Sequence, residues 1–462
     1  MTDQIILEPP ISTRRSVPIA FWTETRSTLL LALPIIFGQL LQNSLSVIDT
    51  LMVGHVSVEA VAAASLATAL FVVPLVFGFG VMGPFSVFVS GSNARGESLE
   101  TIHHLRRELA VSVIIGVGLA ILITVLSGYL NLLDQPTAVL AQARAFLLLL
   151  TWSIVPMYLF QTLKQYCEAL HTAWPPMLIL TGSVFLNIGL NWVFIFGHLG
   201  APALGLIGAG WATLMTRTVT LIVLTAVVYR IHFRGSKKRH ALLHGSFQWQ
   251  GYKDLLGMGL PAGFQVILEV GAFTFAAIMM GWISEAALAA HQVAISVAST
   301  MFMVPLGLSM AVAIRVSHAI GSNDPQRARS CTRGALFVTL GFMSLTAIII
   351  CSLTHNLAAA FVHDSNVIVL AAQILFVAGL FQIFDGTQVV CTGALRGMHD
   401  VKLPTLLNFC GYWLIGLPVS YLLAFHLRLG AVGVWVGLLV GLAMASGLLL
   451  FRLKLILAKV NQ

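Results

Sequence analysis

Twelve long apolar stretches recur along this chain, and they constrain its fold more than any other feature of the sequence. A bilayer core of about 30 Å is crossed by a helix of about 20 apolar residues. Because 58% of the residues are hydrophobic and only 9% are charged, most of the surface must face lipid rather than water. We therefore expect an all-α polytopic membrane protein with twelve transmembrane helices, near residues 28–53, 60–90, 108–131, 145–168, 174–197, 205–230, 255–281, 287–313, 333–355, 366–393, 404–426 and 431–456.

Basic residues are divided unevenly between the connections of these helices. The connections on one side hold most of the Lys and Arg residues, and on the other side we find only Arg144 and Arg428. Because loops rich in Lys and Arg stay in the cytoplasm, the pattern predicts that both termini are cytoplasmic. The clustering of Lys and Arg at helix ends also accounts for the net charge of +8. The positive charge therefore does not indicate nucleic acid as a partner. The first 27 residues are polar and show no cleavable signal.

The two halves of the sequence repeat short motifs in the same order. The pairs are Leu33-Pro34 with Leu260-Pro261, Phe71-x-Val73-Pro74 with Phe302-x-Val304-Pro305, Gly91-Ser92-Asn93 with Gly321-Ser322-Asn323, Ala169-Leu170 with Ala394-Leu395, and Gly205-x-x-Gly208 with Gly430-x-x-Gly433. Since six helices is an even number, the halves share one orientation and should form two pseudo-symmetric six-helix bundles with a cavity between them. The expected organisation is a cytoplasmic segment 1–27, a bundle 28–230, a linker 231–254, a second bundle 255–456 and a tail 457–462.

Four prolines stand inside these predicted helices. They are Pro34 and Pro74 in the first half, and Pro261 and Pro305 in the second half. A proline inside a helix removes one backbone hydrogen bond and usually bends the helix. We expect bends at these positions, and we regard a hinge as a hypothesis.

Three carboxylates lie within or near the apolar stretches. Glu269 stands inside 255–281, Asp385 inside 366–390, and Asp49 toward the outer end of the first helix. A charged side chain at the centre of a membrane helix costs about 2.5 kcal/mol or more. We find no Lys or Arg at comparable depth in the second half, so Glu269 and Asp385 are predicted to bind or relay a cation rather than to form a structural ion pair. For Asp49, an exposed position at a helix end remains an alternative.

Polar side chains accompany these acids on several predicted helices. The set consists of Gln39, Gln42, Asn43, Asn187, Asn191, Gln265, His291, Gln292 and Gln382. Hydrogen bonding between helices is the common role for each such residue taken alone. As a set that lines one cavity, they would bind a polar solute. His291 by itself is more typical of a hydrogen-bonded core histidine than of a proton relay.

The sequence lacks the motifs of enzymes that act at membranes or on nucleotides. There is no P-loop, no HExxH and no GxSxG. The five cysteines show no CxxC or zinc spacing. We therefore expect no enzymatic activity, no ATP hydrolysis and no cofactor.

Several ordered motifs together resemble the multidrug and toxic compound extrusion (MATE) transporters, in particular their NorM-like branch. They are Val47-Ile48-Asp49-Thr50-Leu51-Met52-x-Gly54, Leu260-Pro261 leading to Glu269, Ala289-Ala290-His291-Gln292-Val293-Ala294, and Gln382-Ile383-Phe384-Asp385-Gly386-Thr387-Gln388 followed by Gly393-Ala394-Leu395-Arg396-Gly397. The resemblance runs from about residue 25 to the last helix. It implies a MATE-like fold of the MOP type.

The resemblance also implies an activity. Its members export amphipathic, mostly cationic drugs and dyes in exchange for protons or sodium. By this resemblance Glu269 and Asp385 carry the coupling cation, as a proton site or as a metal site for sodium. Asp49 matches the acid of the first bundle and is a candidate both for coupling the cation and for binding the drug. Gln292 and Asp364 match positions where some relatives contact a drug. Some relatives have a tyrosine where this chain has Phe381, which favours protons slightly. The implied setting is a monomer in the bacterial inner membrane.

Three other readings compete with drug antiport. A major facilitator transporter would carry a basic motif between its second and third helices, where this chain has Ser92-Asn93-Ala94-Arg95-Gly96-Glu97. A lipid-linked sugar flippase of related fold would favour basic residues in its cavity for the pyrophosphate. An intramembrane aspartyl protease would need a GxGD motif, and Asp385 follows Gln382-Ile383-Phe384 instead.

Overall fold

The chain is almost entirely helical over the residues that the computed structural model describes, which are 17–133, 136–233 and 248–459. Within these ranges twelve helical stretches are long and apolar enough to cross a membrane. This confirms the predicted all-α polytopic fold. The predicted segment 1–27, the linker 231–254 and the tail 457–462 each lie partly outside the described residues.

The first half of the chain builds six crossings. They are formed by α1 (Val17–Gly54), α2 (Val58–Met82) with α3 (Phe85–Ala94), α4 (Ser98–Leu126) with the 3-10 turn η1 (Ser127–Leu133), α5 (Thr137–Trp152) with α6 (Ile154–Ala169), α7 (Trp174–Phe196), and α8 (Leu206–Val228) with η2 (Tyr229–Phe233). Two crossings are interrupted, between α2 and α3 at Gly83-Pro84 and between α5 and α6 at Ser153. Proline has no N–H to continue the ladder, which accounts for the first interruption.

The second half also builds six crossings. Its crossings are α10 (Trp249–Ile283), α11 (Glu285–Gly321), α12 (Pro325–Ser352), α14 (Ser365–Gly397), the series α15 (Lys402–Phe409), η3 (Cys410–Gly416), α16 (Leu417–Tyr421) and η4 (Leu422–His426), and finally α17 (Gly430–Lys459). The short α13 (Thr354–Phe361) connects α12 to α14. The turns η3 and η4 are π-helical, a geometry that is rare and frequent at functional sites.

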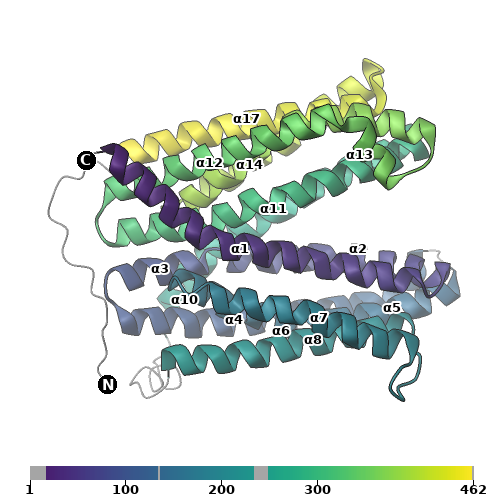
Figure 1. The fold of residues 1–462 in the computed structure, drawn as a ribbon, viewed down its shortest axis with the longest axis horizontal. Coiled ribbons are helices and arrows are strands. Elements are labelled where there is room, and N and C mark those ends of the chain that lie inside the picture. The colour runs from purple at the N-terminus through teal and green to yellow at the C-terminus, as the bar shows by residue number, and fades with distance from the viewer. Residues whose placement is uncertain (1–16, 134–135, 234–247, 460–462) are drawn as a thin grey trace.

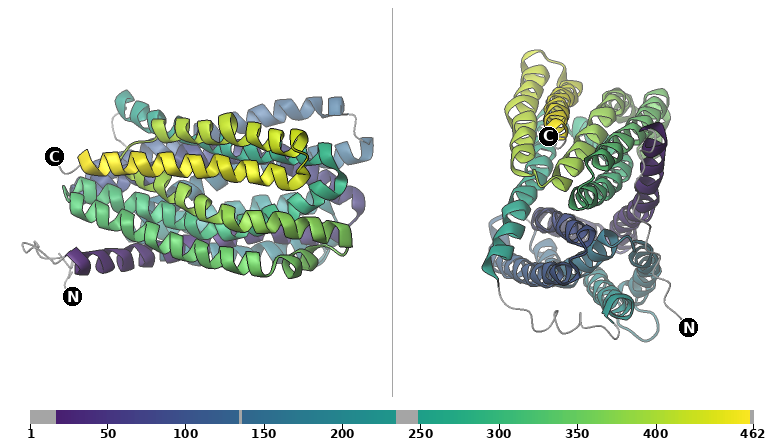
Figure 2. Two further views of the ribbon diagram at one scale, coloured as in Figure 1. Left: turned by 90° about the horizontal axis from the view of Figure 1, so that it is seen from above. Right: turned by 90° about the vertical axis from the view of Figure 1, so that its left-hand side faces the viewer.

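The helices gather into two groups that lie side by side (Figure 1, Figure 2). We call α1–α8 the first bundle and α10–α17 the second bundle. Two helices cross between them. The start of α1 packs in the second bundle, where Leu31, Ala32 and Ile35 share a core with Leu308. In the same way α10 packs along α2 of the first bundle.

Glycines bring the backbones of the two bundles into close contact where α2 meets α10. A Cβ atom at Gly80 would lie 2.6 Å from the Cα atom of Gly263, and a Cβ atom at Gly259 would lie 2.5 Å from the carbonyl oxygen of Val81. Small residues allow such close approach of membrane helices. The seam therefore depends on glycine at these positions.

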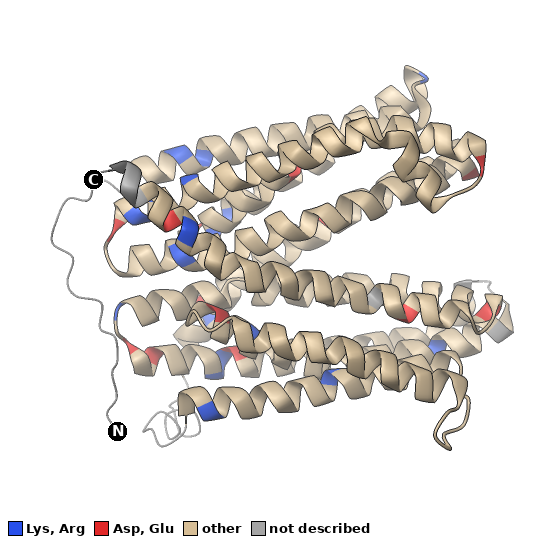
Figure 3. Cartoon of the chain, in the orientation of Figure 1, with Lys and Arg blue, Asp and Glu red and all other residues tan. Residues whose placement is uncertain are grey.

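Lys and Arg residues gather at one end of the molecule, which we call the charged end (Figure 3). The described chain also starts and finishes there, with the beginning of α1 and the end of α17 (Figure 1). The helices run from this end to the opposite end, where α13 lies. The Lys and Arg residues are thus concentrated at one end of the helices, as the sequence pattern predicts.

Candidate functional site

Asp49 of α1 lies at the centre of a hydrogen-bonded cluster in the first bundle. Asn191 of α7 donates its side-chain amide to Oδ1 of Asp49 over 2.7 Å and to Oδ1 of Asn187 over 3.1 Å. Thr213 of α8 donates its hydroxyl to Oδ2 of Asp49 over 3.2 Å. Asn187 and Asn191 are buried. Three helices therefore hold the carboxylate, and the alternative of an exposed aspartate at a helix end is wrong.

A partly buried arginine accompanies this cluster and was not predicted from the sequence. Arg217 stands one turn after Thr213 on α8, and its charge interacts with that of Asp49. Its Nη1 donates to Oγ of Ser153 over 2.5 Å, and its guanidinium carbon lies 5.7 Å from the ring centroid of Phe71. The signal was present in the sequence, since a lone Arg stands inside the apolar stretch 205–230.

Glu269 of α10 and Asp385 of α14 both belong to the second bundle. Their carboxyl groups are close enough for their charges to interact. Asp385 is 5% exposed, and Glu269 is partly buried. Phe273, one turn beyond Glu269, packs edge-on against Phe381, one turn before Asp385, with ring centroids 5.9 Å apart. The aromatic pair thus covers one side of the two acids.

Tyr412 joins this acid pair from the π-helical turn η3, and the sequence analysis missed it. Its phenol interacts electrostatically with Glu269 and Asp385. The side chain is 1% exposed, and its hydroxyl has no hydrogen-bond partner among the described residues. The centroid of its ring lies 6.1 Å from the centroid of the Phe273 ring. The hydroxyl missing at Phe381 is therefore available from a different helix.

Further polar side chains continue from the acids toward the charged end. Gln265 precedes Glu269 by one turn, Gln388 follows Asp385 by one turn, and Asn408 precedes Tyr412 by one turn. All three are buried, and each has side-chain atoms without a partner in the described parts of the chain. Buried polar atoms usually find a partner, so this region of the second bundle is suited to hold water or a small polar solute.

Arg396, at the charged end of α14, interacts electrostatically with Glu269. The expectation that Glu269 has no basic partner is therefore wrong. Arg396 stands about three turns beyond Asp385. Its guanidinium lies close to Gly83 of the first bundle, because a Cβ atom built on that glycine would be 3.1 Å from Nη1 of Arg396. It thus reaches the seam between the bundles while its charge acts on the second-bundle acids.

The remaining predicted residues lie outside these two clusters. Nδ1 of His291 accepts a hydrogen bond from Nε1 of Trp435 over 3.1 Å, as a core histidine would. Gln382 is buried and donates to the carbonyl oxygen of Ala298 over 3.4 Å. Asp364 is exposed and caps α14 by accepting from the backbone N–H groups of Asn366 and Val367. The other three lie along two helices: Gln292 is exposed on α11, and Gln42 and Asn43 are partly buried on α1.

The two bundles are bonded to each other at the charged end. Glu24 of α1 pairs with Arg315 and Arg327 of the second bundle. Ser90 donates to the carbonyl oxygen of Ile314 over 2.8 Å, and Ser317 donates to that of Val87 over 2.7 Å. These contacts fasten the two bundles to each other at the charged end.

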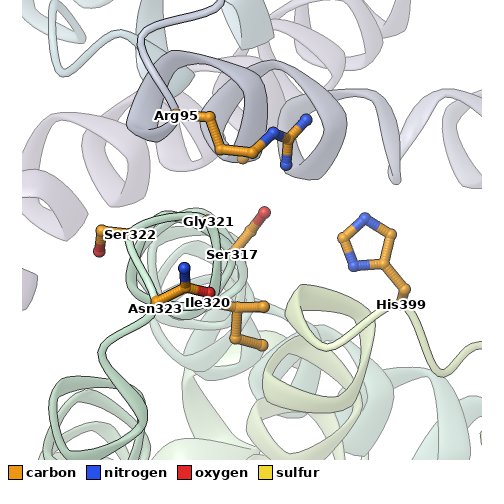
Figure 4. A pocket seen from close by; sticks show the side chains of 8 residues that line it. Arg95, Ser317, Ile320, Gly321, Ser322, Asn323 and His399 are labelled. Atoms are coloured by element: carbon orange, nitrogen blue, oxygen red, sulfur yellow. The ribbon is translucent and has the colours of Figure 1, made fainter.

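A cavity of about 460 Å³ opens at this same seam. Figure 4 shows Arg95 approaching it from the first bundle and Ser317, Asn323 and His399 from the second. The acids Asp49, Glu269 and Asp385 do not line it. No group of three or more His, Cys, Asp or Glu side chains that could hold a metal ion occurs in the described ranges.

Comparisons with known proteins agree with this architecture. The MatE family model matches residues 34–193 and 261–422, one stretch in each bundle. A probable multidrug resistance protein NorM of Mesorhizobium japonicum is 36% identical over 441 residues, which cover 93% of each chain. The multidrug resistance protein MdtK of Yersinia pseudotuberculosis is 31% identical over 439 residues, covering 93% of this chain and 95% of the relative.

Solved structures share the fold. The crystal structure of a eukaryotic MATE transporter superposes with a TM-score of 0.85 at 22% identity, over 96% of this chain and 99% of the other. A multidrug resistance transporter in an outward-facing conformation superposes with a TM-score of 0.88 at 17% identity, over 98% and 100%.

Proposed function

This chain belongs to the MatE family of multidrug efflux transporters, and we propose that it exports amphipathic cations in exchange for a coupling cation by alternating access. One observation carries the proposal most directly. The charges of Glu269 and Asp385 interact inside one bundle, at a depth where a charge is costly unless it binds something. A group that alternately gains and loses a cation there can couple a gradient to drug movement.

We assign the charged end to the cytoplasm, because Lys and Arg are retained on that side. By this assignment both termini are cytoplasmic. The relatives in Mesorhizobium and Yersinia are bacterial, which supports a place in the bacterial inner membrane. The protein would act there as a monomer, since each chain already supplies both bundles.

The coupling cation is proposed to bind between Glu269, Asp385 and Tyr412. With both carboxyl groups ionised, these two negative charges and the one positive charge of Arg396 leave a net charge of minus one. One monovalent cation therefore neutralises the site. A proton is favoured over sodium because one proton lowers the charge of the two carboxyl groups without further ligands, whereas sodium needs a shell of oxygen atoms. If sodium is the ion, the hydroxyl of Tyr412 would add an oxygen to those of the two carboxylates.

The drug is proposed to be cationic and amphipathic. Carboxylates in a low-dielectric cavity attract cations and repel anions. We propose that Asp49, Gln42, Asn43 and Asn187 face the drug in the first bundle, and that Gln292, His291, Gln382 and Asp364 do so in the second bundle.

We infer that the bonds of Glu24, Ser90 and Ser317 across the seam belong to the state that is closed to the cytoplasm. Loading of a cation in the second bundle must favour the opposite state, because a ligand shifts an equilibrium only by its differential affinity for the two states.

The decisive experiment is efflux of a lipophilic cationic dye from vesicles that contain the purified protein. A pH gradient and a sodium gradient are imposed separately. Dye movement driven by a pH gradient without sodium supports proton coupling. Movement driven by sodium at equal pH overturns the preference for protons, and movement with neither gradient overturns antiport itself.

A further inference from the structure

One face of α6 in the first bundle is polar and yet buried. Because residues three and four apart share a face of a helix, this face consists of Gln161, Lys164, Gln165 and Glu168. Each of the four is at most 4% exposed. Gln161 stands eight residues before the end of α6 at Ala169, so the face extends about 12 Å inward from that end. We call it the α6 polar face.

The α6 polar face holds a buried ion pair. Nζ of Lys164 lies 3.3 Å from Oε1 of Glu168, and the two side chains are 2% and 3% exposed. Nζ of Lys164 also donates to Oε1 of Gln39 of α1 over 3.3 Å. Replacing a buried ion pair by apolar side chains of similar volume is often neutral or stabilising. The stability of this state alone therefore does not account for the two charges.

The two glutamines of the α6 polar face are not fully bonded. Oε1 of Gln161 and Oε1 of Gln165 have no hydrogen-bond partner in the parts of the chain that the structure describes. Buried polar atoms are usually paired, and an unpaired one costs its full desolvation. Both oxygens gain a partner when water or a polar solute reaches the face. The face thus has the composition of a wall that is hydrated in another state of the protein.

Helix α1 lies against the α6 polar face where it passes from one bundle to the other. A Cβ atom built on Gly38 of α1 would lie 3.6 Å from Cε of Lys164. Two residues earlier, Ile36 packs on α11 of the second bundle, because a Cβ atom built on Gly307 would lie 2.6 Å from its Cγ1. Parting of the bundles at the charged end therefore strains the bond between Gln39 and Lys164, and it opens the face to water.

We propose that the α6 polar face is the wall on which a cationic drug first binds from the cytoplasm, and that Glu168 is the carboxylate that recognises its charge. Lys164 neutralises Glu168 while the charged end is closed. When this end opens, the cation of the drug takes the place of the Lys164 ammonium, which becomes hydrated. The inference rests on the proposed efflux of cations. It adds a binding site that precedes Asp49 on the path of the drug.

Site-resolved thiol labelling tests whether the face opens. The full-length variant Gln165→Cys is treated with a membrane-impermeant maleimide in inside-out and in right-side-out membrane vesicles, without a gradient, and each modified cysteine is identified by mass spectrometry. We expect labelling in inside-out vesicles, and faster labelling when Glu24→Gln removes the ion pairs between the bundles. No labelling from the cytoplasmic side, with or without Glu24→Gln, would overturn the proposal.

The chain supplies a matched control in the same helix. Cys167 is buried and stands two residues after Gln165, which places it about 200° around α6. It should stay unlabelled in the molecules in which Gln165→Cys reacts. Equal labelling of the two cysteines would show that α6 loosens as a whole, and it would contradict a specific polar face.

The role of Glu168 is tested by protection. Tetraphenylphosphonium, a lipophilic cation, should slow the labelling of Gln165→Cys several-fold. Lys164→Gln combined with Glu168→Gln removes both charges, so it leaves no unpaired charge buried, and it should abolish this protection. In the same double variant the KM for dye efflux should rise several-fold with little change in kcat, as expected when binding is weakened. Protection that persists in the double variant would exclude Glu168 from recognition of the cation.

These readouts separate the inference from the proposed function. Labelling and protection are measured without a gradient, so they report the α6 polar face whether or not a gradient drives transport. Absence of gradient-driven efflux by the unmodified protein would contradict the proposed antiport and leave the labelling result intact.

Discussion

His171 of the first bundle faces His318 of the second bundle edge to face, with ring centroids 5.4 Å apart. A similar contact occurs with the bundles exchanged, where His399 of the second bundle meets Phe88 of the first with ring centroids 5.5 Å apart. His318 stands three residues before Gly321, as Phe88 stands three residues before Gly91. His171 and His399 each follow the end of a helix with a left-handed φ of 62°. Two related aromatic contacts therefore close the charged end.

The first prediction concerns the pH dependence of this closure. Burial lowers the pKa of His171 from 6.5 to about 4, with further lowering from His318, Arg315 and Arg327. Burial and Arg95 also lower the pKa of His399. When the bundles part, water restores an ordinary pKa, so protons bind the open form more strongly. Closure is fully favoured above pH 6.5 and is weakened as the pH falls below that value.

Spin labels at the exposed positions Leu99 and Lys402 measure this opening as a distance distribution. Acidification should increase the population of long distances. The double variant His171→Gln with His399→Gln should respond less to pH. An identical pH response in that variant would show that other groups control the seam.

The second prediction concerns the acid pair. Glu269→Gln and Asp385→Asn keep the size of each side chain but remove the charge that a cation needs. Each should abolish gradient-driven dye efflux while the protein remains folded in the membrane. Circular dichroism and dye binding provide the control for folding. Undiminished efflux by one variant would exclude that residue from coupling.

The third prediction concerns Tyr412. Tyr412→Phe removes a hydroxyl that has no partner among the described residues and keeps the ring contact with Phe273. Coupled efflux should fall several-fold, because the cation loses an oxygen neighbour, with little loss of thermal stability. Adding Phe381→Tyr should restore part of the activity by supplying a hydroxyl from α14. Full activity of Tyr412→Phe alone would contradict a role for the hydroxyl.

The fourth prediction concerns the glycine seam. Gly80→Ala places a methyl group 2.6 Å from the Cα atom of Gly263, and overpacking of this kind costs about 1–3 kcal/mol. The melting temperature and the rate of efflux should both fall. Gly118→Ala on α4 is the matched control, because a Cβ atom there meets nothing within 4 Å. Equal behaviour of the two variants would mean that the bundles do not touch here during transport.

Features that repeat along the chain were predictable from sequence. The twelve crossings follow from hydropathy alone, and the Asn187 and Asn191 pair was visible as two amides one turn apart. Arg217 was missed because basic residues were counted as topology signals at helix ends. Tyr412 reaches the acid pair through a π-helical turn, and Arg396 reaches Glu269 from a different depth. Such neighbours arise from tertiary packing, which local spacing does not encode.

The same limit applies to residues whose role is local. Asp364 caps α14, and His291 bonds to Trp435, so both have partners supplied by the fold. To predict a cap one must know where the helix begins. The partner of His291 lies on α17, 144 residues away in the sequence. The roles of these two side chains in drug binding remain predictions.

Helix α1 is anchored in both bundles, through Glu24 to Arg315 near its start and through Asp49 to Asn191 near its other end. A helix cannot stretch when the bodies that hold its two ends move relative to each other. Parting of the bundles at the charged end must therefore bend α1, for which Pro34 between the two anchors is the natural place, or break the Glu24 contacts. In mechanical terms α1 links the two ends of the molecule, so a displacement at the charged end is transmitted to the hydrogen bonds of the Asp49 carboxylate.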